Sequence, residues 1–179
     1  MTETFREIIY FIKNPTLEKD PNPNFNYRLR KFGKILTISF ISSFLLAIPI
    51  GVLTVTDMIS IESHAMEDIM EKYSFSFVFF LTVAVAPILE EAIFRAPLTL
   101  FKKQRFFKIA IYTSTLLFGF IHITNYELTL RILLFSPFLV APQVFLGFYL
   151  GYTRVRFGLL WAIALHACFN GILMSFEFF

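Results

Sequence analysis

The sequence predicts an all-α, polytopic integral membrane protein, a bundle of about five transmembrane helices. Of the 179 residues, 56% are hydrophobic and only 16% are charged, whereas soluble domains have roughly 45–50% apolar residues. The apolar residues also form stretches that approach the roughly 20 residues a helix needs to cross the hydrocarbon core. Because lipid cannot satisfy backbone polar groups, such stretches are expected to be helices and not open strands. The expected spans are Ile35–Thr56, Tyr73–Leu89 with a continuation to Phe101, Ile109–Tyr126, Ile132–Thr153 and Phe157–Phe176.

Lys and Arg residues cluster in alternate connections between these spans. Seven of the sixteen precede the first span, the loop over residues 57–72 is acidic and contains His64, and the segments KKQRFFK and TRVR are basic. Because basic flanks stay in the cytoplasm, we expect a cytoplasmic amino terminus. The first apolar run starts at residue 35 and lacks a small-residue cleavage pattern, so it does not resemble a signal peptide. The short chain without a targeting sequence favours a bacterial inner membrane.

The chain divides into an amino-terminal arm, residues 1–34, and a transmembrane domain, residues 35–179. Within the arm, Phe5, Ile8, Ile9 and Ile12 share one face at helical spacing. This pattern predicts a short helix lying on the inner membrane surface. A solvated arm without fixed structure is the alternative.

Composition also excludes some classes of function. The single cysteine, Cys168, cannot form an intramolecular disulfide. No Lys/Arg-rich tract lies in a soluble module, so nucleic acid is not an expected partner, whereas the lipid bilayer is. Gly147 and Gly151 form a GxxxG pattern, which predicts close helix contact inside the bundle.

Charged residues interrupt the second expected span in the stretch LEEAIFRAP, residues 89–97. Each charge near the centre of a membrane helix costs about 2.5–3.5 kcal/mol on insertion scales. Glu91 and Arg95 are four residues apart with the glutamate first, the better orientation for an ion pair. Glu90 points about 100° away around the helix and gains no partner from its own neighbours. It therefore needs a partner on another helix or a water-filled cavity.

Two other expected spans carry candidate partners for Glu90. His122 closes the segment FGFIH, and His166 opens HACFN, with Asn170 one turn further along the same face. At 1.5 Å per residue, Glu90, His122 and His166 lie about 16, 20 and 14 Å from their basic helix ends. These similar depths predict one shared cavity.

The chemistry of such a cavity favours addition of water to a carbonyl. A glutamate shielded from bulk water is a competent proton acceptor near neutrality, and imidazoles and a carboxamide offer donors to an oxyanion. Alternatively, Glu90, His122 and His166 could hold a divalent metal such as zinc with one open position. The residues alone leave both routes open.

These segments resemble the motifs of one family of intramembrane proteases. EEAIFR, FGFIH and HACFN match the EExxxR, FxxxH and HxxxN/D motifs of the CPBP family, which includes the type II CAAX prenyl endopeptidases and the Abi proteins. The three motifs occur in order, on separate spans, and the resemblance covers residues 74–171. The chain is shorter than eukaryotic CAAX enzymes, which have more spans.

The resemblance implies a function and a role for each motif residue. It implies an endopeptidase that hydrolyses a peptide bond of a membrane-associated peptide or lipidated protein. Glu90 would activate the water, and His122 would share this task. His166 and Asn170 would stabilise the oxyanion. Glu91 and Arg95 would position the site. The family mechanism is glutamate-dependent without an obligatory metal.

A non-catalytic reading is the alternative. The chain could be a membrane scaffold or a bacteriocin self-immunity protein that keeps the polar cluster for stability. Glu91 and Arg95 fit a purely structural ion pair, and Asn170 could bond across helices. Cys168 faces away from the stripe formed by His166 and Asn170, and is expected to pack and not to act as a nucleophile. A scaffold would have no need of the unpaired Glu90.

Overall fold

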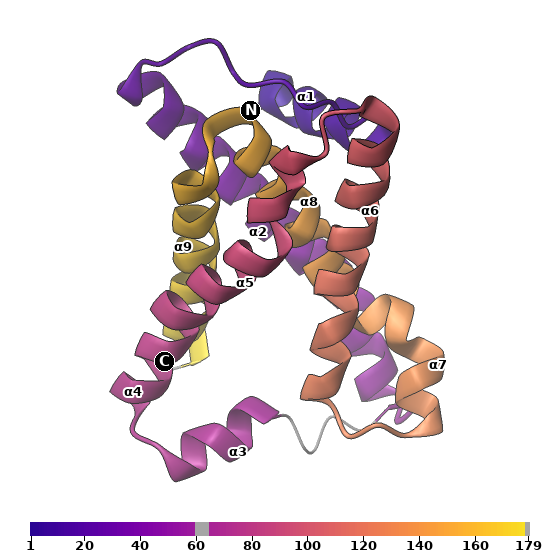
Figure 1. The fold of residues 1–179 in the computed structure, drawn as a ribbon. Helices are drawn as coiled ribbons and strands as arrows, with labels where there is room; N and C mark the ends of the chain where they lie inside the picture. Colours follow the sequence, from indigo (N-terminus) through magenta and orange to yellow (C-terminus); the bar gives the residue numbers. More distant parts are fainter. Residues whose placement is uncertain (60–64, 178–179) are drawn as a thin grey trace.

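A computed structural model describes residues 1–59 and 65–177, and in this part of the chain the regular elements are helices (Figure 1). The all-α class is confirmed. His64 and part of the acidic loop around it lie outside the described residues. The elements in chain order are α1 Thr2–Lys13, α2 Phe25–Val55, α3 Ala65–Lys72, α4 Phe75–Phe80, the π-helix η1 Leu81–Val85, α5 Ala86–Phe94, the 3₁₀-helix η2 Ala96–Leu100, α6 Gln104–Ile121, the 3₁₀-helix η3 His122–Asn125, α7 Leu130–Leu139, α8 Ala141–Phe157 and α9 Leu159–Glu177.

Five helical segments of the described chain are long and apolar enough to cross a membrane, which confirms the predicted polytopic bundle. They cover Phe25–Val55, Phe75–Leu100, Gln104–Asn125, Leu130–Phe157 and Leu159–Phe176.

Two span boundaries differ from the prediction. The first helix begins at Phe25 and not at Ile35, because its basic first turns still form regular helix, with the side chain of Asn24 accepting a hydrogen bond from the Tyr27 N–H. The fourth segment continues beyond Thr153 to Phe157. The sequence predicts Phe157 as the first residue of the last span. The chain turns at Gly158, whose φ of +110° suits glycine. Hydropathy marks the apolar stretch, whereas a helix extends through its charged ends.

Helix α1 is docked onto the bundle. Ile8 and Phe11 are fully buried against it, whereas Phe5, predicted on the same face as Ile8, is 46% exposed. The carboxylate of Glu7 accepts hydrogen bonds from Lys31 Nζ of α2 at 2.7 Å and from the Tyr152 hydroxyl of α8 at 2.8 Å. These contacts hold α1 as an ordered helix across α2 and α8.

Helix α8 lies at the centre of the bundle and packs against α2, α6 and α9. Gly147 and Gly151 permit this packing, since a Cβ on Gly147 would lie 3.0 Å from Thr115 Cγ2 and one on Gly151 would lie 3.3 Å from Ile111 Cδ1. The GxxxG pattern thus brings α8 close to α6, as its spacing predicts.

The second span is a chain of short helices, α4–η1–α5–η2, and it carries the charged residues. At the end of α5, the freed carbonyl of Phe94 accepts from the Ser114 hydroxyl at 2.6 Å. The carbonyls of Arg95 and Ala96 accept from the guanidinium of Arg154 on α8 at 3.1 and 3.3 Å. Side chains of α6 and α8 therefore satisfy the backbone where the membrane helix breaks.

Candidate active site

Helix α5 places Glu91 and Arg95 inside the bundle. Glu91 is 0% exposed and Arg95 is 1% exposed, and Arg95 Nη1 lies 3.4 Å from Glu91 Oε1. The guanidinium carbon of Arg95 also lies 3.9 Å from the centre of the Phe118 ring, a cation–π contact. Charge and the aromatic face together compensate a cation that would otherwise be costly to bury.

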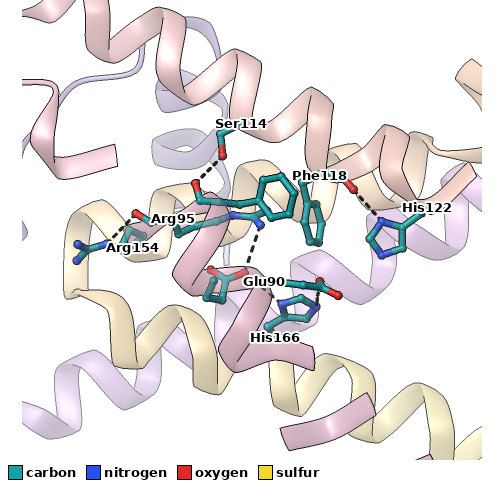
Figure 2. A network of polar contacts seen from close by, with 9 residues as sticks. Glu90, Arg95, Ser114, Phe118, His122, Arg154 and His166 are labelled. Atoms are coloured by element: carbon teal, nitrogen blue, oxygen red, sulfur yellow. Dashed lines mark hydrogen bonds and ion pairs between the residues drawn. The ribbon is translucent and has the colours of Figure 1, made fainter. Parts of the chain in front are cut away.

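His166 of α9 lies between the two carboxylates of α5 (Figure 2). Its Nδ1 is 3.1 Å from Glu91 Oε1, a hydrogen bond, while its Nε2 is 3.7 Å from Glu90 Oε2, an ion-pair distance. Because the Glu91 carboxylate accepts from Nδ1, it fixes the orientation of the imidazole and directs Nε2 toward Glu90. Glu91 is therefore more than the partner of Arg95.

The side chain of Glu90 differs from that of Glu91 in its exposure. It is 30% exposed, whereas that of Glu91 is 0% exposed. Within the described part of the chain, Oε2 of each glutamate is buried without a hydrogen-bond partner, but Glu91 Oε1 is bonded to His166 Nδ1, whereas no hydrogen bond to Glu90 is found. Glu90 is thus the less compensated carboxylate, as the sequence predicts.

Phe118 of α6 joins the two histidines to Arg95 (Figure 2). Its ring is edge-on to His122 at 5.1 Å and to His166 at 5.7 Å between centroids. The Phe118 carbonyl also accepts from His122 Nδ1 at 2.7 Å. Since a carbonyl can only accept, Nδ1 carries the hydrogen in this bond, and Nε2 of a neutral His122 is left as a proton acceptor.

Asn170 satisfies a backbone carbonyl in the π-helix of the second span. In η1 the Ala86 N–H bonds to the Leu81 carbonyl, five residues earlier. The same pattern would pair the Thr82 carbonyl with residue 87, but that residue is a proline and has no N–H. Asn170 Nδ2 donates to the Thr82 carbonyl instead, at 3.0 Å. This bond leaves one amide hydrogen and the oxygen of Asn170 free for other contacts.

A cavity of about 360 Å³ brings the predicted residues together. It lies between the second span, α6, α8 and α9, and its polar lining is Thr82, Glu90, His122, Asn125, Gln143, His166 and Asn170. Glu91 and Arg95 lie behind this lining and support it.

Gln143 at the start of α8 is a lining residue that the motifs did not predict. Its Oε1 is buried and has no hydrogen-bond partner among the described residues. With Leu146, Phe169 and Leu173 it also lines an apolar groove of about 410 Å³, so the groove and the cavity adjoin across these four side chains. The groove extends to Phe44, whose side chain is 75% exposed on the apolar exterior of the bundle.

The side chains do not assemble into a three-ligand metal site in the described residues. No group of three His, Cys, Asp or Glu residues is placed to hold one ion there. Both nitrogens of His166 face glutamate oxygens, and His122 Nδ1 is engaged by a backbone carbonyl. Glu90, His122 and His166 therefore do not converge on one point that could hold an ion.

The fold and the cavity define a class of protein, an integral membrane protein with a carboxylate–histidine site between its spans. The family model of the type II CAAX prenyl endopeptidase Rce1-like proteins matches residues 72–172. The chain belongs to this family, and its class is therefore that of the CAAX-type intramembrane proteases, which act on peptides at the bilayer. No match was found among curated proteins or among solved structures.

The matched residues 72–172 contain the three motifs that carried the resemblance. The structure brings Glu90, His122, His166 and Asn170 around one cavity. Sequence reasoning missed the Glu91–His166 contact and the bond from Asn170 to Thr82. Pro87, five residues after Thr82, was the signal that could have revealed the second.

Proposed function

We propose that the chain hydrolyses a peptide bond of a membrane-associated or lipidated substrate with a water activated by Glu90. The observation that carries this proposal is the pairing of a partly exposed, uncompensated Glu90 with His166 Nε2 at 3.7 Å inside the cavity. Glu91, in contrast, is fully buried and is held by His166 Nδ1 and Arg95 Nη1, so it is not open to the cavity. Residues 35–179 form the protease domain, with the family-like core at 74–171, and residues 1–34 form its docked arm.

The first step is attack of water on the substrate carbonyl. Glu90 takes one proton from the water, and His122 shares this task through its free Nε2, while the water oxygen bonds to the carbonyl carbon. The proton held by Glu90 then passes to the leaving amine as the carbon–nitrogen bond breaks. The resulting products are a new carboxylate and a new amine, and no metal is required.

Stabilisation of the oxyanion falls to His166 and Asn170. With Nδ1 donating to Glu91, His166 directs Nε2 into the cavity, where a hydrogen on this nitrogen would be donated to the oxyanion. Asn170 contributes the amide hydrogen that the Thr82 carbonyl does not use. Glu91 and Arg95 are positioning residues that hold the imidazole.

The apolar groove supports a membrane-borne substrate. It adjoins the cavity and extends to the apolar exterior of the bundle, so a lipid tail or an apolar side chain would lie in it next to a peptide at Glu90. The basic helix ends and the arm lie at one face, which supports a cytoplasmic amino terminus, and we place the protein in a bacterial inner membrane.

Cleavage of a peptide library by the purified protein in lipid tests this function. The library should include prenylated carboxyl-terminal tails, and wild type should be compared with Glu90→Gln and His122→Ala, each with and without a strong chelator. We expect cleavage by wild type alone, unaffected by the chelator. Loss of cleavage with the chelator would contradict the metal-free route.

The second candidate is a non-catalytic scaffold or bacteriocin self-immunity protein. The buried cluster of Glu91, Arg95 and His166 favours it, because each of the three has a partner inside the bundle. Cleavage that Glu90→Gln does not change would support the scaffold and assign the activity to a contaminant.

A further inference from the structure

A second, more polar cavity lies at one end of the bundle, away from Glu90. Its volume is about 730 Å³. Its lining combines the connector after α1 with the start of α2, the η2–α6 turn and the α8–α9 turn. In Figure 1 these segments meet at the same end of the molecule, opposite α3 and α7.

The lining of this cavity is basic. Lys19, Arg28, Lys102, Arg154 and Arg156 contribute five positive charges, and Glu18 and Asp20 contribute two negative charges, a difference of +3. The cavity is formed where spans begin and end, so it lies at the depth of the lipid headgroups.

Arg154 and Arg28 are held in place by backbone carbonyls, which carry no net charge to neutralise theirs, whereas Arg156 pairs with Glu18. Arg154 bonds to the carbonyls of Arg95 and Ala96 through Nε and Nη2, and Arg28 bonds to the Asn22 carbonyl through Nε. In both, Nη1 still has hydrogens to donate. A guanidinium fixed in this way is pre-organised for an anion.

Most of the acidic groups in the lining already have partners. Asp20 accepts from the Tyr27 hydroxyl at 2.9 Å and from the Asn22 N–H at 2.9 Å. Glu18 is 69% exposed and lies 3.6 Å from Arg156 Nη1. The side-chain ammonium groups of Lys19 and Lys102 have no hydrogen bond or ion pair among the described residues, so their charges are available to a ligand.

We propose that this cavity binds a phosphate group. A tetrahedral anion with several acceptor oxygens matches the free donors of the arginines and lysines. Two sources of phosphate are consistent with the position of the cavity: the headgroup of an anionic phospholipid and free inorganic phosphate. This binding is independent of peptide hydrolysis and of Glu90.

Native mass spectrometry of the full chain in neutral detergent, at 0.15 M salt, tests the proposal. The probes are phosphatidylglycerol, phosphatidylcholine and inorganic phosphate. The cavity variant is Lys19→Gln/Lys102→Gln, which removes no internal contact. The matched control is Lys103→Gln/Arg105→Gln, which removes the same charge from exposed residues of the same end outside the cavity lining.

We expect phosphatidylglycerol to bind better than phosphatidylcholine, and the cavity variant to weaken it by about tenfold. The control should lose less than about threefold, because salt screens distant charges beyond about 8 Å. Binding of inorganic phosphate to lipid-free protein, with the same dependence on the cavity pair, would identify the free ion as the ligand. Equal losses in the cavity and control variants would overturn the proposal. So would binding of phosphatidylglycerol and inorganic phosphate that is no tighter than that of zwitterionic phosphatidylcholine, whose phosphate charge is balanced by its choline.

Discussion

His166 Nδ1 lies 3.1 Å from Glu91 Oε1, and the same carboxylate oxygen lies 3.4 Å from Arg95 Nη1. One buried oxygen therefore holds both the cation that it neutralises and the imidazole that faces the cavity. The two adjacent glutamates therefore have different roles, because Glu91 holds buried groups inside the protein and Glu90 faces the cavity.

Replacing Glu91 by Gln should lower the stability of the protein much more than replacing Glu90 by Gln. Glu91→Gln leaves Arg95 buried without its counter-charge and should lower the free energy of unfolding by about 3–5 kcal/mol. Glu90→Gln removes a partly exposed carboxylate with no hydrogen bond to Oε2 and should cost about 1 kcal/mol or less. Chemical unfolding in micelles measures both. Equal stability of the two variants would contradict the division of roles.

Gly147 should be intolerant of a side chain. In Gly147→Ala the new Cβ would lie 3.0 Å from Thr115 Cγ2 and 3.2 Å from Arg95 Nη2. Such overpacking costs about 1–3 kcal/mol, and displacement of Arg95 should also reduce cleavage.

Gly33→Ala is the matched control for Gly147→Ala. Gly33 also lies in a helix, but nothing lies within 4 Å of its added Cβ. It should therefore gain up to about 1 kcal/mol from helix propensity. A stable, active Gly147→Ala protein would contradict the close approach of α8 to Arg95.

Asn170 and Pro87 should be energetically coupled. Asn170→Leu leaves the Thr82 carbonyl without its donor, at a cost of about 1–3 kcal/mol. Pro87→Ala supplies a backbone N–H next to that carbonyl. The double variant should then be more stable than the sum of the single effects predicts, by about 0.5 kcal/mol or more. Strict additivity in a double-mutant cycle would exclude the proposed reason for this contact.

Cys168 should be dispensable for hydrolysis. Its side chain is exposed and is not part of the cavity lining. We expect Cys168→Ala to cleave at the wild-type rate, and a thiol reagent to leave that rate unchanged. Inactivation of wild type but not of Cys168→Ala by the reagent would show that the thiol lies beside the substrate.

The number of spans and the motif residues were predictable from the sequence because each leaves a local signal. Uninterrupted hydropathy marked the spans, and the cost of burying charge marked Glu90, Glu91 and Arg95. Helix ends were less predictable. The basic segment TRVR predicts a loop at Arg154 and Arg156, but α8 continues through them to Phe157. Arg154 then donates to backbone carbonyls at the end of α5.

Contacts between helices were the part that the sequence could not supply. Spacing along one helix pairs Glu91 with Arg95, but only the packing of α9 against α5 brings His166 onto the same oxygen. Similarly, Pro142 indicates a local bend beside Gln143, but the sequence alone does not show that the Gln143 side chain lines the cavity. Its exposure to the cavity depends on where α8 begins after the break at Val140.

Glu90 is proposed to activate the water that cleaves a membrane-borne peptide. The most direct test of this proposal compares the peptide termini in membranes that contain equal amounts of wild type or Glu90→Gln, so that no substrate has to be chosen in advance. We expect a set of new carboxyl termini in membranes with wild type that is absent in membranes with Glu90→Gln. Identical sets of termini with the two proteins would contradict the proposal.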